Sequence, residues 1–379
     1  MELSVVILNY NVCHFLRQCI LSVQKAIQEI EAEIIVIDNN SSDGSTEMIK
    51  NEFPELLLIE NKENIGFGRA NNQAVSYAKG KYICILNPDT AVGSDVFIKC
   101  LSFIKNTPDC GAIGVRMIDG TGNFLPESKR NLPTPQVSLS KIIWKNKKGH
   151  LYYANHLQEK SRGRVSILSG AFMFMKRSLY QSVEGFDRDY FMYGEDIDLS
   201  YKIEKKGLSN YYLGDAVILH YKGESTRKDK HYLNRFYGAM HIFYNKHFST
   251  NYFNNALVYI GIEVIKTLKM FSIKEKKRPL PPIDIILFIS EDEKFYKKLK
   301  HYFTAPVLLA SLEDYKKKKL ENTMVIWDAN YYDYQFILEY MNKDAGKNVL
   351  FRIRPEGTEQ IIGSDRSDDK GEVIDMKNF

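Results

Sequence analysis

Short apolar runs alternate with helical patterns along the first 115 residues. The runs are continuous and often β-branched, as buried strands are, and apolar positions between them recur with the helical period. Strands are expected at residues 4–8, 33–37, 56–60 and 82–86, and helices at 15–30, 46–52, 69–78 and 94–105. This alternation predicts βαβ units that form a Rossmann-like, mostly parallel α/β sheet flanked by helices.

The pattern changes beyond this region. Residues 120–164 are irregular and rich in Pro, Lys and Gly, which predicts a long loop or an insertion on the acceptor side. Strand-like runs follow at 165–175 and 211–221, and 233–271 is helical and aromatic-rich. Three prolines, at 279, 281 and 282, then mark a linker before further strand-like runs at 283–289 and 323–327. We therefore expect three parts: a catalytic domain at 1–230, a helical segment at 231–280 and a small α/β domain at 281–379.

Composition narrows the choice of partners and compartment. A net charge of +5 over 379 residues is too mild for a nucleic-acid-binding surface. The five cysteines are odd in number and form no CxxC pair, which indicates reduced core thiols. The N-terminal apolar run stops at Leu8, which is too short for a signal-peptide core, and no apolar stretch reaches the ~20 residues of a spanning helix. A cytoplasmic protein is expected.

Polar loops follow the first four expected strands, where ligands bind in parallel sheets. Asp38 directly follows a strand and could accept a hydrogen bond from a nucleobase, whereas Asp43 has the alternative role of a helix cap. Gly66 allows close backbone approach, and Arg69 suits an anion, although a plain turn and cap fits this loop as well. The loops predict a ligand crevice at this edge.

Carboxylates also mark a later helix start, where Glu195, Asp196 and Asp198 fall in the first turn. The positive end of the helix dipole keeps such groups ionised and available as a base or metal partner, but acidic residues are also common there for that reason alone. Asp89 follows another strand and suits Mg²⁺ or Mn²⁺. His220 ends a strand ahead of a glycine-containing loop, where a purely structural histidine is the alternative.

The order of these motifs resembles family 2 glycosyltransferases of the GT-A fold. The matching segments are NYN at 9–11, VIDNNSSDGS at 36–45, NIGFGRANN at 64–72, LNPDT at 86–90, GAFMFMKR at 170–177, GFD with FMYGEDIDL at 185–199, and His220. The resemblance covers residues 1 to about 250 and is strongest to the rhamnosyltransferase-like branch that builds bacterial surface polysaccharides. It implies an inverting enzyme that moves a sugar from a nucleotide-sugar donor, such as dTDP-rhamnose or a UDP-sugar, to a glycan or lipid-linked glycan acceptor.

The resemblance also implies a role for each matching residue. It makes Asp196 the catalytic base, Asp89 the ligand of a divalent metal (Mg²⁺ or Mn²⁺) and His220 a further metal ligand, and it assigns Asp38 to the nucleobase. Asn87 stands where many relatives carry an aspartate, and as a neutral acceptor it would contact ribose or phosphate. The full set expected to bind the donor is Asn9, Asn11, Asp38, Asn40, Gly66, Arg69, Asn87 and Glu195.

The helical segment suggests contact with a membrane. Leu257, Ile260, Val264, Leu268 and Phe271 fall on one helical face, and a basic run from Lys274 to Arg278 follows. This pattern suits an interfacial helix on anionic lipid and a peripheral location on the inner face of the cell membrane. Packing against the rest of the protein is the alternative.

Two other functions compete for the whole chain. They are a non-catalytic glycan- or nucleotide-binding protein and an α/β phosphohydrolase. The absence of a GxSxG or phosphate-loop motif disfavours the phosphohydrolase.

Overall fold

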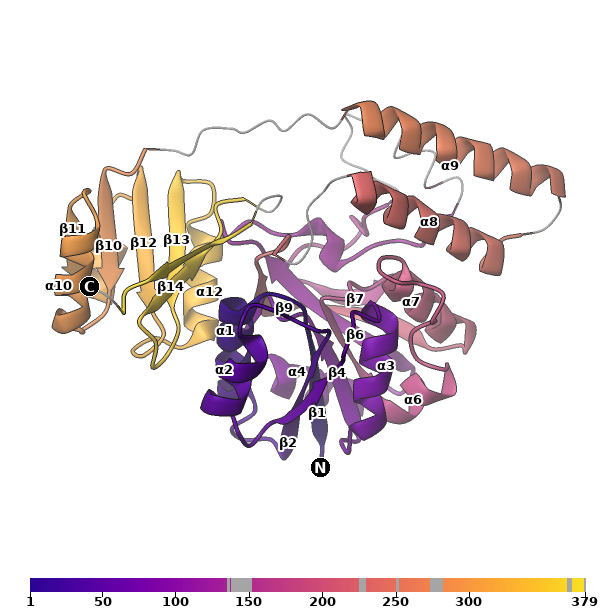
Figure 1. Cartoon of the computed structure of the whole chain (residues 1–379), viewed down its shortest axis with the longest axis horizontal. Coiled ribbons are helices and arrows are strands. Elements are labelled where there is room, and N and C mark those ends of the chain that lie inside the picture. Colours follow the sequence, from indigo (N-terminus) through magenta and orange to yellow (C-terminus); the bar gives the residue numbers. More distant parts are fainter. Residues whose placement is uncertain are drawn as a thin grey trace.

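A computed structural model describes residues 1–134, 137, 152–224, 230–249, 252–272, 282–366 and 370–377. Its described residues form two β-sheets and a helix pair (Figure 1). Within them, no helix is both long enough and apolar enough to cross a bilayer.

The first sheet has nine strands in the described residues, in the order β3-β2-β1-β4-β8-β6-β9-β5, with β7 paired to β9. The strands are β1 (Leu3–Asn9), β2 (Ala32–Asp38), β3 (Leu57–Glu60), β4 (Tyr82–Leu86), β5 (Thr90–Val92), β6 (Cys110–Ile118), β7 (Arg162–Val165), β8 (Phe172–Lys176) and β9 (Ser209–His220). The pairings make β5, β7 and β8 antiparallel to the others, so most strands share one direction. The expected mostly parallel α/β sheet is confirmed.

Helices cover both faces of this sheet and enclose two apolar cores. They are α1 (Cys13–Ala26), α2 (Ser45–Glu52), α3 (Phe67–Tyr77), α4 (Val96–Asn106), α6 (Arg177–Ser182) and α7 (Glu195–Lys205), with a 3₁₀ turn at Pro126–Ser128. One core gathers residues of α1, α2 and α4, and the other gathers residues of α3, α6 and α7. The register places Asn9 beside Asp38 and Asp38 beside Glu60, so the polar loops share one edge as predicted.

Two differences from the sequence expectation lie near that edge. The run at 165–175 is not one strand, because the chain turns between β7 and β8 at Gly170. A Cβ at Gly170 would lie 3.3 Å from Cβ of Asp196, so this turn is packed against the acidic helix. The second difference is β6, a fully buried strand that the apolar pattern did not single out.

Helices α8 (Lys230–His247) and α9 (Tyr252–Ser272) form a pair outside the sheet (Figure 1). α8 packs on the loop and helix around α7 through Ala239, Phe243 and Tyr190, and Nε2 of His247 lies 2.6 Å from Oδ1 of Asp198. Ile262 of α9 is buried against α8, whereas Ile260 and Val264 are 58 % and 52 % exposed. Part of the predicted apolar face therefore points away from the protein.

The second sheet forms a small α/β unit, as predicted. It has six strands in the order β11-β10-β12-β13-β14-β15, with the first four parallel. Its elements are β10 (Ile285–Ile289), α10 (Glu293–Tyr302), β11 (Val307–Ala310), α11 (Leu312–Lys317), β12 (Thr323–Asp328), α12 (Tyr334–Lys343), β13 (Val349–Arg354), β14 (Gln360–Gly363) and β15 (Glu372–Asp375). The boundaries 1–230, 231–280 and 281–379 remain a prediction.

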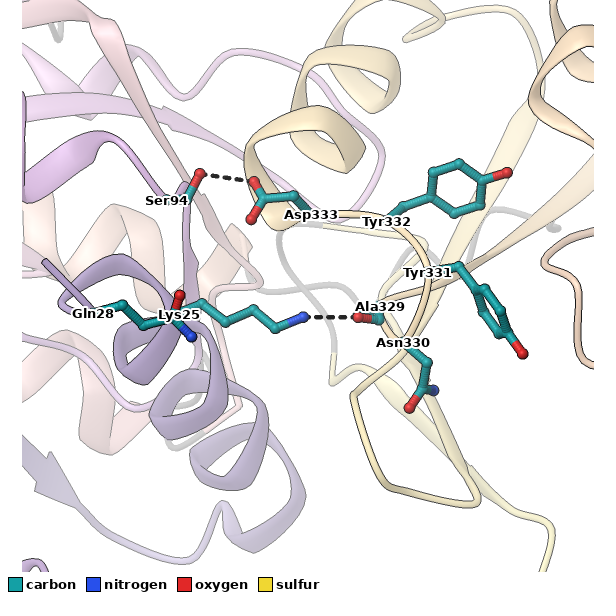
Figure 2. A pocket seen from close by; sticks show the side chains of 8 residues that line it. All are labelled: Lys25, Gln28, Ser94, Ala329, Asn330, Tyr331, Tyr332 and Asp333. Atoms are coloured by element: carbon teal, nitrogen blue, oxygen red, sulfur yellow. Dashed lines mark hydrogen bonds between the residues drawn. The ribbon is translucent and has the colours of Figure 1, made fainter.

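The two sheets share one apolar core instead of being joined only by a linker. Phe15, Leu219 and Tyr221 of the first part belong to the same buried cluster as Trp327 and Ile337 of the second. Figure 2 shows polar contacts beside a cavity of about 280 Å³ at this interface, where Lys25 Nζ donates to Ala329 O at 2.9 Å and Ser94 Oγ donates to Asp333 at 2.8 Å. The second sheet is therefore an integral part of the folded chain.

Candidate active site

Asp89 and His220 are brought together by strand pairing. β5 follows the turn at Asn87–Asp89 and pairs with the end of β9, with Thr90 opposite His220. The pairing leaves Oδ1 of Asp89 3.4 Å from Nε2 of His220, and both residues are buried. The Tyr221 N–H also donates to Asp89 O at 3.0 Å, which fixes the turn. Two residues 131 positions apart in sequence thus form one polar pair.

This pair fits a divalent metal that is shared with a substrate. Among the described residues, no three His, Cys, Asp or Glu side chains converge as a metal cage. Mg²⁺ and Mn²⁺ sites of nucleotide enzymes take one or two protein ligands and complete the shell with phosphate and water. A carboxylate and an imidazole suit that arrangement, and Nδ1 of His220 is buried without a partner in the structure.

The three carboxylates of the acidic helix have different environments. Asp198 is fully buried and bound by His247 and by Lys202, whose Nζ lies 3.2 Å away, so it attaches α8 to α7. Asp196 is partly buried and contacts Arg130. Glu195 is buried, and its Oε2 has no hydrogen-bond partner. Of these three carboxylates, Asp198 has a structural role, which leaves Glu195 and Asp196 as the candidates for chemistry.

Arg130 holds Asp196 through a short ion pair. Its Nη2 lies 2.6 Å from Oδ2 of Asp196, and the Gly170 N–H donates to the same oxygen at 3.1 Å. The other oxygen, Oδ1, accepts from the Ile197 N–H at 2.8 Å. The carboxylate is therefore held in one orientation by three donors.

Glu195 is a carboxylic acid that stays protonated near neutral pH. Burial and, to a smaller extent, the neighbouring charge of Asp196 together raise its pKa from 4.5 to about 8, against the opposing effects of a backbone hydrogen bond and of Arg130. A buried carboxyl with a perturbed pKa and an unpaired oxygen is typical of functional sites. Its protonated oxygen can donate a hydrogen bond to a ligand.

The two acidic groups belong to one region. The Asn87 N–H donates to Ala171 O at 3.0 Å, and the preceding residue, Gly170, contacts Asp196. The turn between β7 and β8 thus links the Asp89 loop to the acidic helix. The two motifs are therefore linked at one edge of the sheet.

Asp38 and its neighbours form a hydrogen-bonded loop at the same edge. Asn9 Nδ2 donates to Asp38 Oδ1 at 2.7 Å and to Ser41 Oγ, and the Ser41 N–H donates to Asp38 Oδ2 at 2.8 Å. Asn11 accepts from the Ser42 N–H at 2.8 Å, whereas Asn40 is exposed. Asp38 and Asn9 are almost completely buried, so their first role is to shape the loop. Contact with a nucleobase remains a prediction for this set.

Asp43 has the structural role that the sequence left open. Its Oδ2 accepts from the Cys13 N–H at 2.8 Å, at the start of α1, and its Oδ1 accepts from Ser45 at the start of α2. The carboxylate therefore satisfies amide groups at two helix starts, as a capping side chain does.

Gly66 joins the glycine-containing loop to the acidic motif. Its φ is +87°, and a Cβ there would lie 2.6 Å from Phe191 O, which accepts from the Phe67 N–H at 2.8 Å. A side chain at position 66 would therefore push these loops apart. Arg69 is exposed and donates through Nε to Arg188 O at 3.1 Å, so it lies beside the same segment.

Sequence reasoning missed three residues at this edge. Arg130 holds Asp196. Lys222, two residues after His220, forms an ion pair with Glu127 and lowers the pKa of that carboxyl against the opposing effect of burial. Glu127 and Arg130 lie in the region that looked irregular. The charged stretch ESKR was the available signal, but only the fold shows that Arg130 reaches Asp196 and that Glu127 pairs with Lys222.

Unpaired buried polar atoms gather in this region. Besides Oε2 of Glu195 and Nδ1 of His220, they include Oδ1 of Asn9, Oδ1 of Asn87 and Nε of Arg130. A buried polar atom without a partner is costly, and native structures usually supply one through water or a ligand. The edge therefore offers unpaired polar atoms to a polar ligand.

Comparison with known proteins shows which family this chain resembles. Residues 4–183 match the family model described as glycosyl transferase family 2, which confirms the resemblance inferred from the motifs.

Two curated relatives extend beyond that region. The N-acetylglucosaminyl-diphospho-decaprenol L-rhamnosyltransferase of Mycobacterium tuberculosis is 26 % identical over 241 residues, covering 60 % of this chain and 78 % of that protein. An uncharacterized glycosyltransferase of Methanocaldococcus jannaschii is 29 % identical over 297 residues, covering 72 % of this chain and 94 % of that protein.

Among solved structures, the chain is similar to a mannosyltransferase from Pyrobaculum calidifontis in complex with GDP-Man and Mn²⁺. The TM-score is 0.48 at 16 % identity, covering 71 % of this chain and 72 % of that one.

Proposed function

We propose that this protein is an inverting glycosyltransferase that extends a surface glycan, because residues 4–183 match the model of glycosyl transferase family 2. The donor is a nucleotide sugar, and the acceptor is a glycan, most simply one carried on a lipid diphosphate as in the name of the mycobacterial relative. The observation that carries the proposal is the convergence of Asp89, His220, Glu195 and Asp196 at the carboxyl edge of one sheet.

The transfer uses Asp196 as the base. The acceptor hydroxyl gives its proton to the carboxylate while its oxygen attacks the anomeric carbon, and the bond from that carbon to the diphosphate oxygen breaks. Attack from the face opposite the leaving group inverts the anomeric carbon. Arg130 and the Gly170 and Ile197 N–H groups hold the carboxylate for this approach.

Asp89 and His220 would hold a divalent metal, Mg²⁺ or Mn²⁺. The metal supplies positive charge that stabilises the departing nucleoside diphosphate. Asn87 and protonated Glu195 offer an amide and a hydroxyl to the donor beside that pair, and the loops of Asp38, Asn40 and Gly66 would receive its nucleoside.

We place the enzyme at the inner face of the cell membrane through α9. Ile260 and Val264 are exposed and lie four positions apart, so they share one helical face. Leu257, Leu268 and Phe271 also belong to α9, but their side chains, like the whole basic run at 274–278, lie outside what the structure describes. Replacing Lys274, Lys276, Lys277 and Arg278 together by Ser should reduce binding to anionic liposomes, with zwitterionic liposomes as the control.

The experiment that tests the function is a donor screen. Purified protein is incubated with dTDP-, UDP- and GDP-sugars with Mn²⁺ or Mg²⁺, and thermal stabilisation and slow release of nucleoside diphosphate are followed. The proposal expects one class of nucleotide sugar to stabilise the protein more with metal than with EDTA. Binding of free sugars or glycans without nucleotide would favour the non-catalytic alternative, and release of inorganic phosphate would favour the phosphohydrolase.

A further inference from the structure

A basic groove lies on the second sheet, away from the residues proposed for catalysis. Five lysines line it, and its volume is about 600 Å³, which is in the size range of small-ligand sites. The five are Lys316, Lys318, Lys319, Lys343 and Lys347. We call this site the lysine groove.

Most of the positive charge in the lysine groove is not neutralised by the protein. Lys347 pairs with Asp344 at 2.5 Å, and Lys319 pairs with Glu321 at 3.0 Å. Within the described part of the chain, no carboxylate lies within ion-pair distance of Lys316, Lys318 or Lys343. Lysines in the last turn of a helix compensate its dipole, and this explains the position of Lys316 and that of Lys343 when each is considered alone. It does not account for their convergence with Lys318 in one groove.

The orientation of the second sheet shows which side the groove faces. The groove is built from segments before β12 and β13, and is therefore at the amino ends of these strands. β10, β12 and β13 are parallel, and Figure 1 shows that β10 begins on the side of the molecule where α9 lies. β1 runs from the opposite side toward α8 and α9, so the proposed active edge also faces that way. The groove, α9 and the active edge therefore lie on one side of the molecule.

We propose that the lysine groove binds the phosphate headgroups of anionic lipid and gives the enzyme a second membrane contact. Each basic residue near an anionic surface adds to binding, and three ammonium groups with no carboxylate within ion-pair distance suit several phosphates. The proposal extends the membrane contact of α9 and does not depend on the transfer reaction. A bilayer held by α9 and by the groove would lie against the side where a lipid-linked acceptor is needed.

Liposome flotation tests this inference on the full-length protein. The variant Lys316→Ser, Lys318→Ser, Lys343→Ser is compared with a control of equal charge loss, Lys79→Ser, Lys81→Ser, Lys294→Ser. The control lysines are exposed, and they precede β4 or begin α10, which places them on the opposite side of the molecule. Vesicles contain phosphatidylcholine alone or with phosphatidylglycerol, and circular dichroism melting checks that both variants are folded.

The groove variant should lose about tenfold or more in partition to phosphatidylglycerol vesicles, while the control keeps most of its binding. Equal losses in both variants would overturn the proposal, because net charge alone would then explain binding. Groove-dependent binding of inorganic pyrophosphate without a groove-dependent change on vesicles would also overturn it, since the occupant would be a soluble phosphate ligand. A third variant, Ile260→Ser, Val264→Ser, separates the two contacts: the groove effect should persist in its background, and disappearance of the effect there would contradict an independent contact.

Discussion

The buried carboxyl of Glu195 should make the free energy of unfolding of this protein depend on pH. The carboxyl is buried, its Oε2 is unpaired, and its pKa is raised from 4.5 to about 8, chiefly by desolvation. In the unfolded chain the same group ionises near the ordinary value. Between these two pH values the folded protein keeps a proton that the unfolded chain has lost, so the free energy of unfolding falls as pH rises and the loss is complete above about pH 8.

The size of the effect follows from the shift. One pKa unit corresponds to about 1.4 kcal/mol, so about two units between pH 6 and pH 8 give an upper limit of about 3 kcal/mol. Coupling to Asp196 divides this value between two groups, and we expect about 1–3 kcal/mol. Glu195→Gln cannot ionise and should remove this loss. The variant should therefore gain stability relative to wild type on going from about pH 6 to about pH 9.

Urea denaturation of both proteins at these two pH values, without nucleotide or metal, measures the difference. Glu63→Gln, at an exposed position, serves as the control and should track wild type at both. The reasoning would be refuted if the free energies of unfolding of Glu195→Gln and wild type differed by the same amount at both pH values. That result would show that Glu195 in the folded protein does not change its protonation between about pH 6 and about pH 9.

Three further predictions concern the site and the second sheet. Asp89→Ala should abolish the increase in nucleotide affinity that Mn²⁺ produces, measured by calorimetry, and an unchanged metal effect would remove Asp89 from the metal site. Arg130→Gln should lower turnover by about tenfold or more and alter its pH profile while nucleotide affinity persists, with partial recovery in Arg130→Lys; a loss confined to nucleotide binding would contradict its role in holding Asp196. A chain ending at Arg278 should elute as aggregate in gel filtration, because it exposes Phe15, Leu219 and Tyr221; a soluble monomer with native circular dichroism would show that the shared core is dispensable.

The order of the elements could be predicted because local patterns determine it. The first four strands and the helices between them follow from runs of apolar residues with distinct periods, and the shared edge of their loops follows from parallel pairing. The contact of Asp89 with His220 was implied only by family resemblance. It depends on β5, a three-residue strand that is too short to leave a recognisable pattern.

The remaining features depend on contacts between distant segments. Arg130 reaches Asp196 across 66 positions, and no periodicity in the sequence signals that pair. Gly120 and Gly122 looked like loop residues, but a Cβ at either would collide with Ser364 O or Met341 O, so both serve the packing of the second sheet. Burial of that sheet against α1, β5 and β9 is likewise a property of the whole fold.

The central claim is tested most directly by sugar transfer itself. Wild-type protein and Asp196→Asn are incubated with the radiolabelled donor from the screen, Mn²⁺ and a bacterial lipid extract that contains lipid diphosphate glycans. The account predicts that wild type moves label into the lipid fraction, and that Asp196→Asn binds the same donor but transfers it at least about 10²-fold more slowly. Transfer by Asp196→Asn at the wild-type rate would contradict the assignment of the base, and donor consumption by wild type with no label in any glycan would contradict the glycosyltransferase.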